Sequence, residues 1–365
     1  MAEKVLAAVM IGKKQTEVQE FIMPEISDDS GILKIEATGV CGSDCHFYSE
    51  ENRPPRILGH ENVGFIHKIG KSASERWGVK EGDRVALEEY LPCGSCSFCR
   101  SGNFRSCAMT DIRQPGLRFR YGYTPISVKP ALWGGYSQYQ YLHPSTVLHK
   151  VPNHIPAEQL AMAVPLSNGI QWAYLEGGSG PGKTVLIQGP GQQGLACVVA
   201  AKASGAACVI VTGISRDANR LEVARQLGAD YTINVEAENL KERVTEITGG
   251  KMVDISIDVS AGGPDTIINA IECTKKRGVV VFAASKKVPI PNYNNDLIVS
   301  NHLTIKGVRG HSYNAVELAI ENIASNQFSL HLMCTHSFGL SDVDKAIRTV
   351  AGELNPGAVH VTVIP

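Results

Sequence analysis

Four of the ten cysteines fall within fifteen residues, in the order Cys93-x-x-Cys96-x-x-Cys99 and, after seven more residues, Cys107. Four thiolates at this spacing, in a loop with glycine and serine, are able to wrap one tetrahedral zinc ion. A site closed by four thiolates leaves no position for a substrate, so we expect it to brace a lobe. The alternative is four free surface thiols, which would be open to oxidation. In a reducing compartment a metal site is also favoured over disulfides.

A second group of metal donors lies in residues 39–46 (GVCGSDCH) and 59–61 (GHE). Cys41 offers a thiolate, His60 an imidazole and Glu61 a carboxylate, a donor set that suits a zinc ion with room for a substrate. Taken alone, a cysteine and a histidine mean little, because buried cysteines and satisfied histidines are common. Their combination with the four-cysteine lobe and a nucleotide-binding pattern favours a catalytic metal.

Three glycines, Gly189, Gly191 and Gly194, form the pattern GxGxxG between an apolar strand and a helix-like stretch. This pattern permits a tight turn, close approach of the backbone to a pyrophosphate and close packing of helix on strand. The helix that follows presents free N–H groups to the phosphates. We therefore expect dinucleotide binding. The candidate cofactor residues are Gly189, Gly191, Gln192, Gln193, Gly194, Gly213, Ser215, Arg216 and Ser260.

Cofactor choice depends on the residue about 20 positions past the glycines, where an acid would bind the ribose and favour NAD. That place is held by Gly213, and Ser215 and Arg216 follow it. Without the acid a 2′-phosphate meets no repulsion, and Arg216 is able to bind it. Alternatively, Asp217 does the work of the acid in a longer loop. We expect NADP to be favoured over NAD.

Residues 177–184 (GGSGPGKT) match the ATP-binding pattern GxxxxGK[ST]. A loop of that kind must follow a strand and open a helix. Here it follows a helix-like stretch and leads into a strand, so we interpret it as a turn-rich connector.

Two kinds of architecture must position these residues. Residues 1–150 contain short β-type runs separated by glycine, proline and polar turns, which is typical of an antiparallel, barrel-like unit. From residue 183 strands and helices alternate, which predicts βαβ units and a parallel sheet. The alternation of strands and helices stops after residue 308, so we expect the chain to return to the first domain there. The predicted α/β protein has a catalytic domain of residues 1–165 and 309–365 and a nucleotide-binding domain of residues 166–308.

Composition excludes several function classes. The 365 residues carry a net charge of −1, which argues against a strongly basic nucleic-acid binder. No apolar run approaches the roughly 20 residues of a membrane helix, and the first residues lack the pattern of a secretory signal. We expect a cytoplasmic protein. Neither nucleic acid nor a membrane is an expected partner.

The chain resembles the zinc-containing medium-chain dehydrogenases, the family of alcohol, sorbitol, threonine and butanediol dehydrogenases. The resemblance spans essentially the whole chain and rests on four ordered features: GVCGSDCH, GHE-x-x-G at residues 59–64, the four-cysteine lobe and the GxGxxG turn. It implies a GroES-like β-barrel with an inserted Rossmann domain, and two zinc ions per chain. It also implies reversible hydride transfer between a small alcohol, most simply a secondary one, or its carbonyl product and NAD or NADP. The resemblance further implies a homodimer or homotetramer.

The resemblance assigns roles to individual residues. Cys41 and His60 correspond to ligands of the catalytic zinc, and Glu61 to a residue that binds directly in some members and lies behind the ligands in others. Ser43 corresponds to the hydroxyl that takes the alcohol proton, and His46 to the histidine that delivers it to solvent. Asp44 corresponds to the acid that orients the zinc-bound histidine. The loop of residues 113–123 is a candidate for the substrate cleft or for an oligomer contact.

One position departs from the family. Sorbitol-type members carry Glu-Pro-Leu-Ser where a third ligand is needed, and here residues 163–169 read AVPLSNG, which places Val164 there. Since valine cannot coordinate, either Glu61 supplies the third protein ligand, with water fourth, or zinc is bound weakly. Two alternatives stay open: a polyol or amino-alcohol dehydrogenase, and a non-catalytic nucleotide-binding relative that only Val164 supports.

Overall fold

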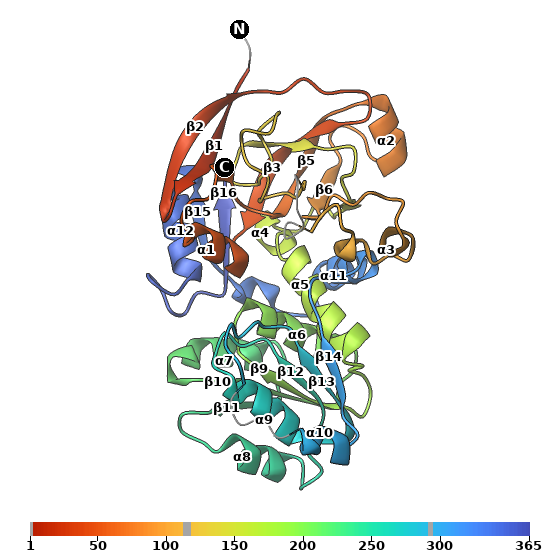
Figure 1. Cartoon of the computed structure of the whole chain (residues 1–365), viewed down its shortest axis with the longest axis vertical. Coiled ribbons are helices and arrows are strands. Elements are labelled where there is room, and N and C mark those ends of the chain that lie inside the picture. Colours follow the sequence, from red (N-terminus) through yellow and green to blue (C-terminus); the bar gives the residue numbers. More distant parts are fainter. Residues whose placement is uncertain (1–2, 112–117, 291–294) are drawn as a thin grey trace. The chain divides into compact units, whose positions relative to one another are not determined.

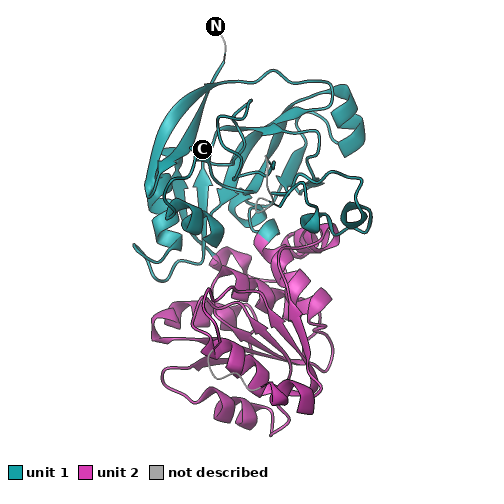
Figure 2. Ribbon diagram, in the orientation of Figure 1, with its two compact units in different colours: residues 1–164, 334–365 teal, residues 165–333 magenta. Residues whose placement is uncertain are grey.

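The computed structural model describes residues 3–111, 118–290 and 295–365 (Figure 1). The chain forms two compact units (Figure 2). Unit 1 comprises Met1–Val164 and Cys334–Pro365, and unit 2 comprises Pro165–Met333. Among the described residues, no helix combines the length and the apolar character that a membrane crossing needs.

Unit 1 is built on two sheets, one in the order β2-β1-β4 and one in the order β15-β16-β3-β5-β6-β8, with β7 paired to β3. Neighbouring strands are antiparallel except β15 and β16, which run parallel. Buried apolar side chains from these strands form the two cores of the unit. The strands are β1 (Lys4–Gly12), β2 (Gln15–Ile22), β3 (Gly31–Gly39), β4 (Arg56–Ile57), β5 (Glu61–Ile69), β6 (Arg84–Leu87), β7 (Tyr139–Leu142), β8 (Leu148–Lys150), β15 (Cys334–Gly339) and β16 (His360–Ile364).

Short helices connect these strands and hold the candidate metal donors. Two of them matter for the site, since Cys41 caps the N-terminus of one and Cys96 caps the other. The helices of this part are α1 (Gly42–Tyr48), α2 (Lys71–Trp77), α3 (Ser97–Arg100), η1 (Phe104–Ser106), α4 (Ala157–Leu160), η5 (Leu340–Asp342) and α12 (Val343–Val350), and α5 (Ala163–Gly169) begins in unit 1 and ends in unit 2.

Unit 2 contains one six-stranded parallel sheet in the order β11-β10-β9-β12-β13-β14. Its central strand β9 is fully buried at Val185, Leu186 and Ile187, as expected when helices cover both faces of a parallel sheet. The predicted α/β architecture with a Rossmann sheet is confirmed. The strands are β9 (Thr184–Gln188), β10 (Cys208–Gly213), β11 (Tyr231–Asn234), β12 (Val253–Asp258), β13 (Thr274–Phe282) and β14 (Thr304–Gly307).

Helices alternate with these strands as the sequence predicts. They are α6 (Gln192–Ala203), η3 (Ser215–Asp217), α7 (Ala218–Gln226), α8 (Leu240–Ile247), α9 (Asp265–Cys273), α10 (Asp296–Ser300), α11 (Tyr313–Ser325) and η4 (Leu330–Leu332). The π-helix η2 (Ile170–Glu176) precedes residues 177–184, and β9 follows them. This order of helix, loop and strand agrees with the connector interpretation of that segment.

The boundary after unit 2 lies later than predicted. The chain returns to unit 1 at Cys334 and not at residue 309. The reason is α11, which follows the last strand, packs on η2 and buries Val316, Ala319 and Ile323 inside unit 2. The alternation of strands and helices in the sequence ends at the last strand of the sheet. One more helix, α11, follows that strand and still belongs to unit 2. The first boundary, between Val164 and Pro165, lies one residue before the predicted one.

Candidate active site

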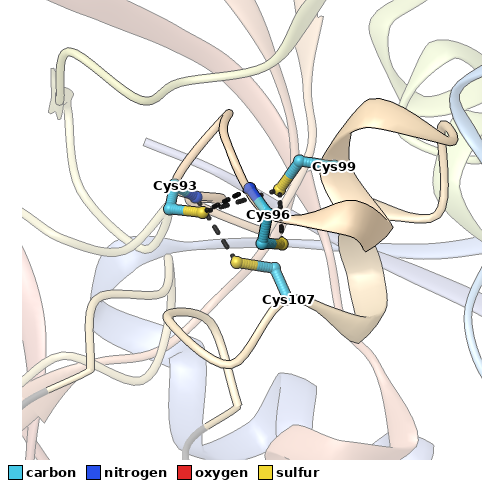
Figure 3. A group of neighbouring side chains, drawn as sticks. All are labelled: Cys93, Cys96, Cys99 and Cys107. Carbon is cyan, nitrogen blue, oxygen red and sulfur yellow. Dashed lines mark hydrogen bonds between the residues drawn. The ribbon is translucent and has the colours of Figure 1, made fainter.

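The four-cysteine lobe is formed by α3, η1 and the loops around them (Figure 3). The four sulfur atoms lie within 4.8 Å of one another. The Cys96 and Cys99 sulfurs are 3.4 Å apart, and the backbone N–H groups of Cys93 and Cys96 each donate to a sulfur at 3.4 Å. All ten cysteines lie in the described part of the chain, and all are free thiols. Four sulfurs that converge in this way match the donor set of a closed zinc site.

Hydrogen bonds prepare one of these thiols for metal binding. The Ser95 hydroxyl and the backbone N–H groups of Ser95 and Cys96 lower the pKa of Cys93 to about 6. Burial raises the pKa of Cys99 to about 12. Because a thiolate is the form that binds metal, Cys93 offers its charge near neutral pH while Cys99 needs the cation itself to release its proton.

The second donor group lies where β3 ends and β5 begins. Strand register places Gly39 opposite Glu61, and the chain continues from Gly39 through Val40 to Cys41 at the start of α1. Donor atoms of Cys41, His60 and Glu61 all lie within 4.8 Å of one another, and His60 and Glu61 are buried. One sulfur, one nitrogen and one oxygen donor are a set that zinc accepts. The residues present therefore fit a catalytic zinc ion.

Asp44 ties the two ligand-bearing segments together. Its carboxylate is 2% exposed and accepts hydrogen bonds from the Cys41 backbone N–H at 3.0 Å and from the Tyr136 hydroxyl at 2.9 Å. The other carboxylate oxygen lies 3.4 Å from Nδ1 of His60. This arrangement fixes the imidazole of His60 so that its second nitrogen faces the other donors.

The electrostatic state of the donors reflects their burial. Burial, followed by the nearby Glu61 carboxylate, raises the pKa of the Cys41 thiol. Burial alone lowers the pKa of His60, but Tyr123, Asp44 and Glu89 around it outweigh this effect and raise the pKa well above its usual value. A buried cation removes the conflict between these anionic groups, because it favours both the thiolate and the neutral imidazole.

Ser43 and His46 come from the same helix but lie in different surroundings. The Ser43 hydroxyl lies 3.4 Å from Nε2 of His60 and accepts a hydrogen bond from the Tyr123 hydroxyl at 3.1 Å. The His46 side chain is half exposed, and its Nε2 lies 3.0 Å from a carboxylate oxygen of Glu50. The structure therefore brings Ser43 to the donor group and leaves His46 at the surface of α1.

Val164 lies in the first turn of α5 and is buried. Its side chain carries no donor atom, so the third-ligand position of the sorbitol-type pattern is apolar in this chain. Part of the loop of residues 113–123 lies outside the described residues, and the expectation for it can be followed only from residue 118 onward.

Sequence reasoning missed Glu89 and the groups that surround it beside the donor group. One Glu89 oxygen lies 3.7 Å from Nε2 of His60, and the other forms an ion pair with Arg120 at 2.5 Å. The Arg120 guanidinium lies over the rings of Tyr90 and Tyr123, 4.7 Å and 4.4 Å from their centres. The available signal was the pair of acidic residues inside the otherwise apolar run 85–91, since a buried charge needs a partner or a function.

His360 was also missed. It begins β16, is 0% exposed, and burial lowers its pKa to about 4. A Cβ atom built on Gly39 would lie 2.3 Å from Oε2 of Glu61 and 2.8 Å from Cε1 of His360. Both side chains therefore approach the space that Gly39 leaves open.

Unit 2 shapes the predicted nucleotide turn as its glycines require. Gly189 has a φ of +103°, a conformation that other residues rarely adopt, and a Cβ on Gly194 would lie 1.8 Å from the Gly189 carbonyl oxygen. Gly191 caps the N-terminus of α6, and a Cβ there meets nothing within 4 Å. Gln192 and Gln193 form the first turn of α6.

The end of β10 borders a cavity of about 490 Å³. Its lining includes five of the predicted cofactor residues: Gly189, Gly191, Gly213, Arg216 and Ser260. Ser215 lies in the loop after β10 and donates its backbone N–H to Glu236 at 2.9 Å.

Asp217 is turned toward the protein. It is 7% exposed and accepts a hydrogen bond from the Ile214 backbone N–H at 3.2 Å. Its second oxygen lies 3.2 Å from the Arg220 guanidinium, and Arg216 beside it is exposed. The carboxylate that could replace the missing acid is thus engaged by groups of its own loop.

Ser260, one of the predicted cofactor residues, is held in place by a buried ion pair. The sequence analysis did not predict this ion pair. Lys286 lies 2.8 Å from Asp258 and donates to the Ser260 carbonyl at 2.6 Å. The Ser260 backbone N–H in turn donates to Asp258 at 3.1 Å. This network holds the edge of the cavity at the ends of β12 and β13.

Comparison with known proteins shows the family to which the chain is similar. The family described as alcohol dehydrogenase GroES-like domain matches residues 27–153, and the family described as zinc-binding dehydrogenase matches residues 194–325. The chain is 35% identical to a probable alcohol dehydrogenase of Mycobacterium tuberculosis, over 96% of this chain and 95% of the relative. It is 30% identical to a sorbitol dehydrogenase of Bacillus subtilis, over 94% of this chain and 92% of the relative.

A solved structure shows the same fold. The chain is similar to an alcohol dehydrogenase from Thermotoga maritima with a TM-score of 0.87 and 29% sequence identity, and all of both chains is covered. With its metal donors in unit 1 and its nucleotide turn in unit 2, the chain belongs to the zinc-containing medium-chain dehydrogenase family and is an alcohol oxidoreductase linked to a nicotinamide cofactor.

Proposed function

We propose that the chain is a zinc-dependent alcohol dehydrogenase that transfers hydride reversibly between a secondary alcohol and NADP. The observation that carries the proposal is the convergence of Cys41, His60 and Glu61 in a chain that also forms the glycine turn of a nucleotide-binding sheet. The side chains of the protein bind and orient the reactants and transfer one proton.

Three side chains of unit 1 would hold the catalytic zinc: Cys41, His60 and Glu61. When bound, zinc supplies Lewis-acid chemistry, since it polarises a substrate oxygen and lowers the pKa of an alcohol. Asp44 keeps the His60 ring in one orientation through its contact with Nδ1. Glu61 takes the place of the ligand that Val164 does not provide. The four-cysteine lobe would hold the second zinc and brace its loop.

The proton of the alcohol leaves through Ser43. Its hydroxyl lies beside His60, and the Tyr123 hydroxyl donates to it and so fixes its orientation. His46, on the same helix and half exposed, then exchanges the proton with solvent. A bound nicotinamide cofactor would supply the acceptor for hydride from the carbinol carbon, so the two electrons and the proton would leave by separate routes.

Preference for NADP follows from charges at the end of β10. Gly213 carries no acid, and Arg216 and Arg220 line the cavity. Asp217 is engaged by Ile214 and Arg220 and therefore offers little to the ribose hydroxyls. A phosphate with roughly two negative charges gains from a nearby guanidinium through paired hydrogen bonds.

The edge of the parallel sheet supports a proposal that the protein is a homodimer or homotetramer. In the described part of the chain β14 ends the sheet, and Ile305 on it and Val299 before it are exposed by 36% and 65%. An uncovered strand edge with apolar neighbours favours pairing with a second copy. We also propose a reducing, cytoplasmic location, since ten free thiols persist only where disulfides do not form.

The function is tested with a substrate panel and a metal analysis. Simple secondary alcohols, polyols and amino alcohols are offered with NAD and NADP in parallel, and zinc is measured in the same preparation. We expect oxidation of secondary alcohols with NADP and close to two zinc ions per chain. Turnover restricted to polyols or amino alcohols would replace the substrate proposal. Absence of turnover with every alcohol, in protein that carries both zinc ions, would refute it.

A further inference from the structure

Three neighbouring strands of unit 1 place chemically active residues on one face. Gly39 of β3 lies opposite Thr362 of β16 on one side and opposite Glu61 of β5 on the other. The antiparallel register of β3 and β16 continues one step further, since the Val40 N–H donates to the Val361 carbonyl at 2.9 Å. Two residues along each strand from the Gly39–Thr362 pair, His360 therefore lies opposite the metal donor Cys41, on the same face as Glu61.

Gly39 provides the space in which two of these side chains meet. A Cβ atom at this position would lie 2.3 Å from Oε2 of Glu61 and 2.8 Å from Cε1 of His360, so any other residue would push one or both away. Gly39 has no need of a left-handed conformation, since its φ is not positive. Close approach of the carboxylate and the imidazole is thus the reason for a glycine here.

The His360 ring is buried and makes no hydrogen bond of good geometry. It is 0% exposed, and neither ring nitrogen has a well-aligned hydrogen-bond partner among the described residues. Burial lowers its pKa, and the Glu158 backbone beside it acts in the opposite direction. Buried polar groups are nearly always paired, so an orphaned imidazole needs an explanation. A neutral imidazole presents one N–H donor and one acceptor, and Oε2 of Glu61 borders the same space beside Gly39 as the ring does.

We propose that His360 is a positioning residue that holds the Glu61 carboxylate in its metal-binding orientation. A half-turn of the ring about χ2, a torsion with two-fold wells, places Nε2 where Cε1 now lies. The N–H on that atom then donates to Oε2 of Glu61. The inference rests on the proposed role of Glu61 as a metal ligand.

The absence of a ligand at Val164 makes this support necessary. A carboxylate that serves as the third protein ligand loses metal if it is free to rotate away, and ligating carboxylates are themselves held by hydrogen bonds. His360 offers such a bond from a rigid position, because β16 is buried between β15 and β3. Loss of an outer partner of this kind lowers metal affinity by roughly 10–100-fold.

The test compares two side chains of equal length at one position. His360→Gln keeps an N–H donor, and His360→Met has none. Affinity of the full-length protein for zinc at the catalytic site is measured by competition with a chelator, and the absorption spectrum of the Co²⁺-loaded protein reports the ligand geometry. We expect His360→Met to bind zinc roughly 10–100-fold more weakly with an altered Co²⁺ spectrum. His360→Gln should stay within a few-fold of the unsubstituted protein.

Kinetics separate metal retention from chemistry. Excess zinc should restore kcat of His360→Met with little change in KM, because the substituted residue touches neither substrate nor cofactor. The matched control is His336→Met on the neighbouring strand β15, where the imidazole contacts Asn355 instead of Glu61. This control should leave zinc affinity unchanged. Retention of the four-cysteine zinc shows that each variant is folded, and His360→Leu replaces any Met variant that is not.

Several results would overturn the inference. Equal loss of affinity in His360→Gln and His360→Met would show that the imidazole only fills space. Unchanged affinity and spectrum in His360→Met would show that Glu61 needs no support. Either result leaves the proposed function intact if the unsubstituted protein holds two zinc ions and oxidises alcohols. Failure of the unsubstituted protein to do so would instead refute the proposed function itself.

Discussion

We expect zinc binding at the catalytic site to depend on Glu61, because this carboxylate would stand in for a ligand that Val164 cannot supply. Replacement by glutamine removes the negative charge and keeps the shape. We expect Glu61→Gln to lose zinc at the catalytic site by more than the roughly 10–100-fold that removal of an outer partner costs. Turnover should fall with it. Zinc content after dialysis measures the first effect and steady-state rates the second.

Glu75→Gln, on the exposed surface of α2, is the matched control and should retain both zinc ions. A Glu61→Gln variant with full zinc and full rate would show that Glu61 lies behind the ligands. Val164→Glu is a complementary probe, since a carboxylate there restores the donor of the sorbitol-type pattern and is expected to tighten zinc binding.

Ser43 is the residue through which we expect the substrate proton to leave. Ser43→Ala removes the hydroxyl between Tyr123 and His60, so kcat should fall on the order of 10²–10⁴-fold while zinc content stays constant. Ser43→Thr keeps a hydroxyl and should recover most of the rate. Ser49→Ala, at the end of the same helix, serves as the control. An undiminished kcat in Ser43→Ala would place the proton route elsewhere.

We expect Arg216 to carry the proposed preference for NADP. A guanidinium–phosphate contact contributes about 1.5–3 kcal/mol, so Arg216→Ala should raise KM for NADP roughly tenfold or more and change KM for NAD little. Arg225→Ala, which removes a surface charge paired with Glu222 on the same helix α7, should affect neither cofactor. Equal effects of Arg216→Ala on both cofactors, or equal use of both by the unsubstituted protein, would contradict the assignment.

At the scale of elements, the turn between β9 and α6 contains glycines that are needed for two different reasons. A Cβ on Gly194 would lie 1.8 Å from the Gly189 carbonyl oxygen, whereas a Cβ on Gly191 meets nothing in the protein. Gly194→Ala should therefore destabilise the fold by about 1–3 kcal/mol through overpacking. Gly191→Ala should unfold like the unsubstituted protein and yet bind the cofactor more weakly, because this glycine is needed for approach of the pyrophosphate.

Thermal unfolding and cofactor titration of both variants check this contrast. Equal melting temperatures for the two variants would show that the turn relaxes around Gly194. Undisturbed cofactor binding by Gly191→Ala would show that the pyrophosphate does not lie against this residue.

At the scale of the whole molecule, a half-buried histidine links stability to pH. His143 packs against Phe119 and Trp133 in the core of unit 1, and burial lowers its pKa below the ordinary value of 6.5. The unfolded chain then binds a proton at a pH where the folded chain does not. Stability is therefore complete above about pH 6.5 and declines as the pH falls below it.

The measurement is chemical unfolding at pH 7 and pH 5. The unsubstituted protein should lose free energy of unfolding between these values, and His143→Phe, which keeps an aromatic ring in the same core, should lose less. His154→Phe offers a control at a histidine outside the core clusters. An identical pH dependence in protein with and without His143 would assign the effect to other groups.

The sequence determined the features that are encoded in short, contiguous segments. The spacing of Cys93 to Cys107 and the glycines at residues 189–194 are set by local backbone geometry, so both could be read directly. The pairing of Cys41 with His60 and Glu61 could be anticipated from the motif around each, and the parallel sheet from the alternation of strands and helices. These conclusions need no knowledge of which distant segments meet.

Tertiary structure alone decided what surrounds those motifs. Glu89 lies near His60 and pairs with Arg120, and Glu61 and His360 both approach the space at Gly39. Segments that lie far apart in the chain bring these side chains together. A single-residue shift of register would turn such side chains to the opposite face, and no local pattern specifies that register. The late return of the chain at Cys334 has the same origin, since the packing of α11 decides it. Local sequence motifs were enough to predict the candidate metal ligands. The residues that surround these ligands depend on contacts between distant segments, which only the tertiary structure shows.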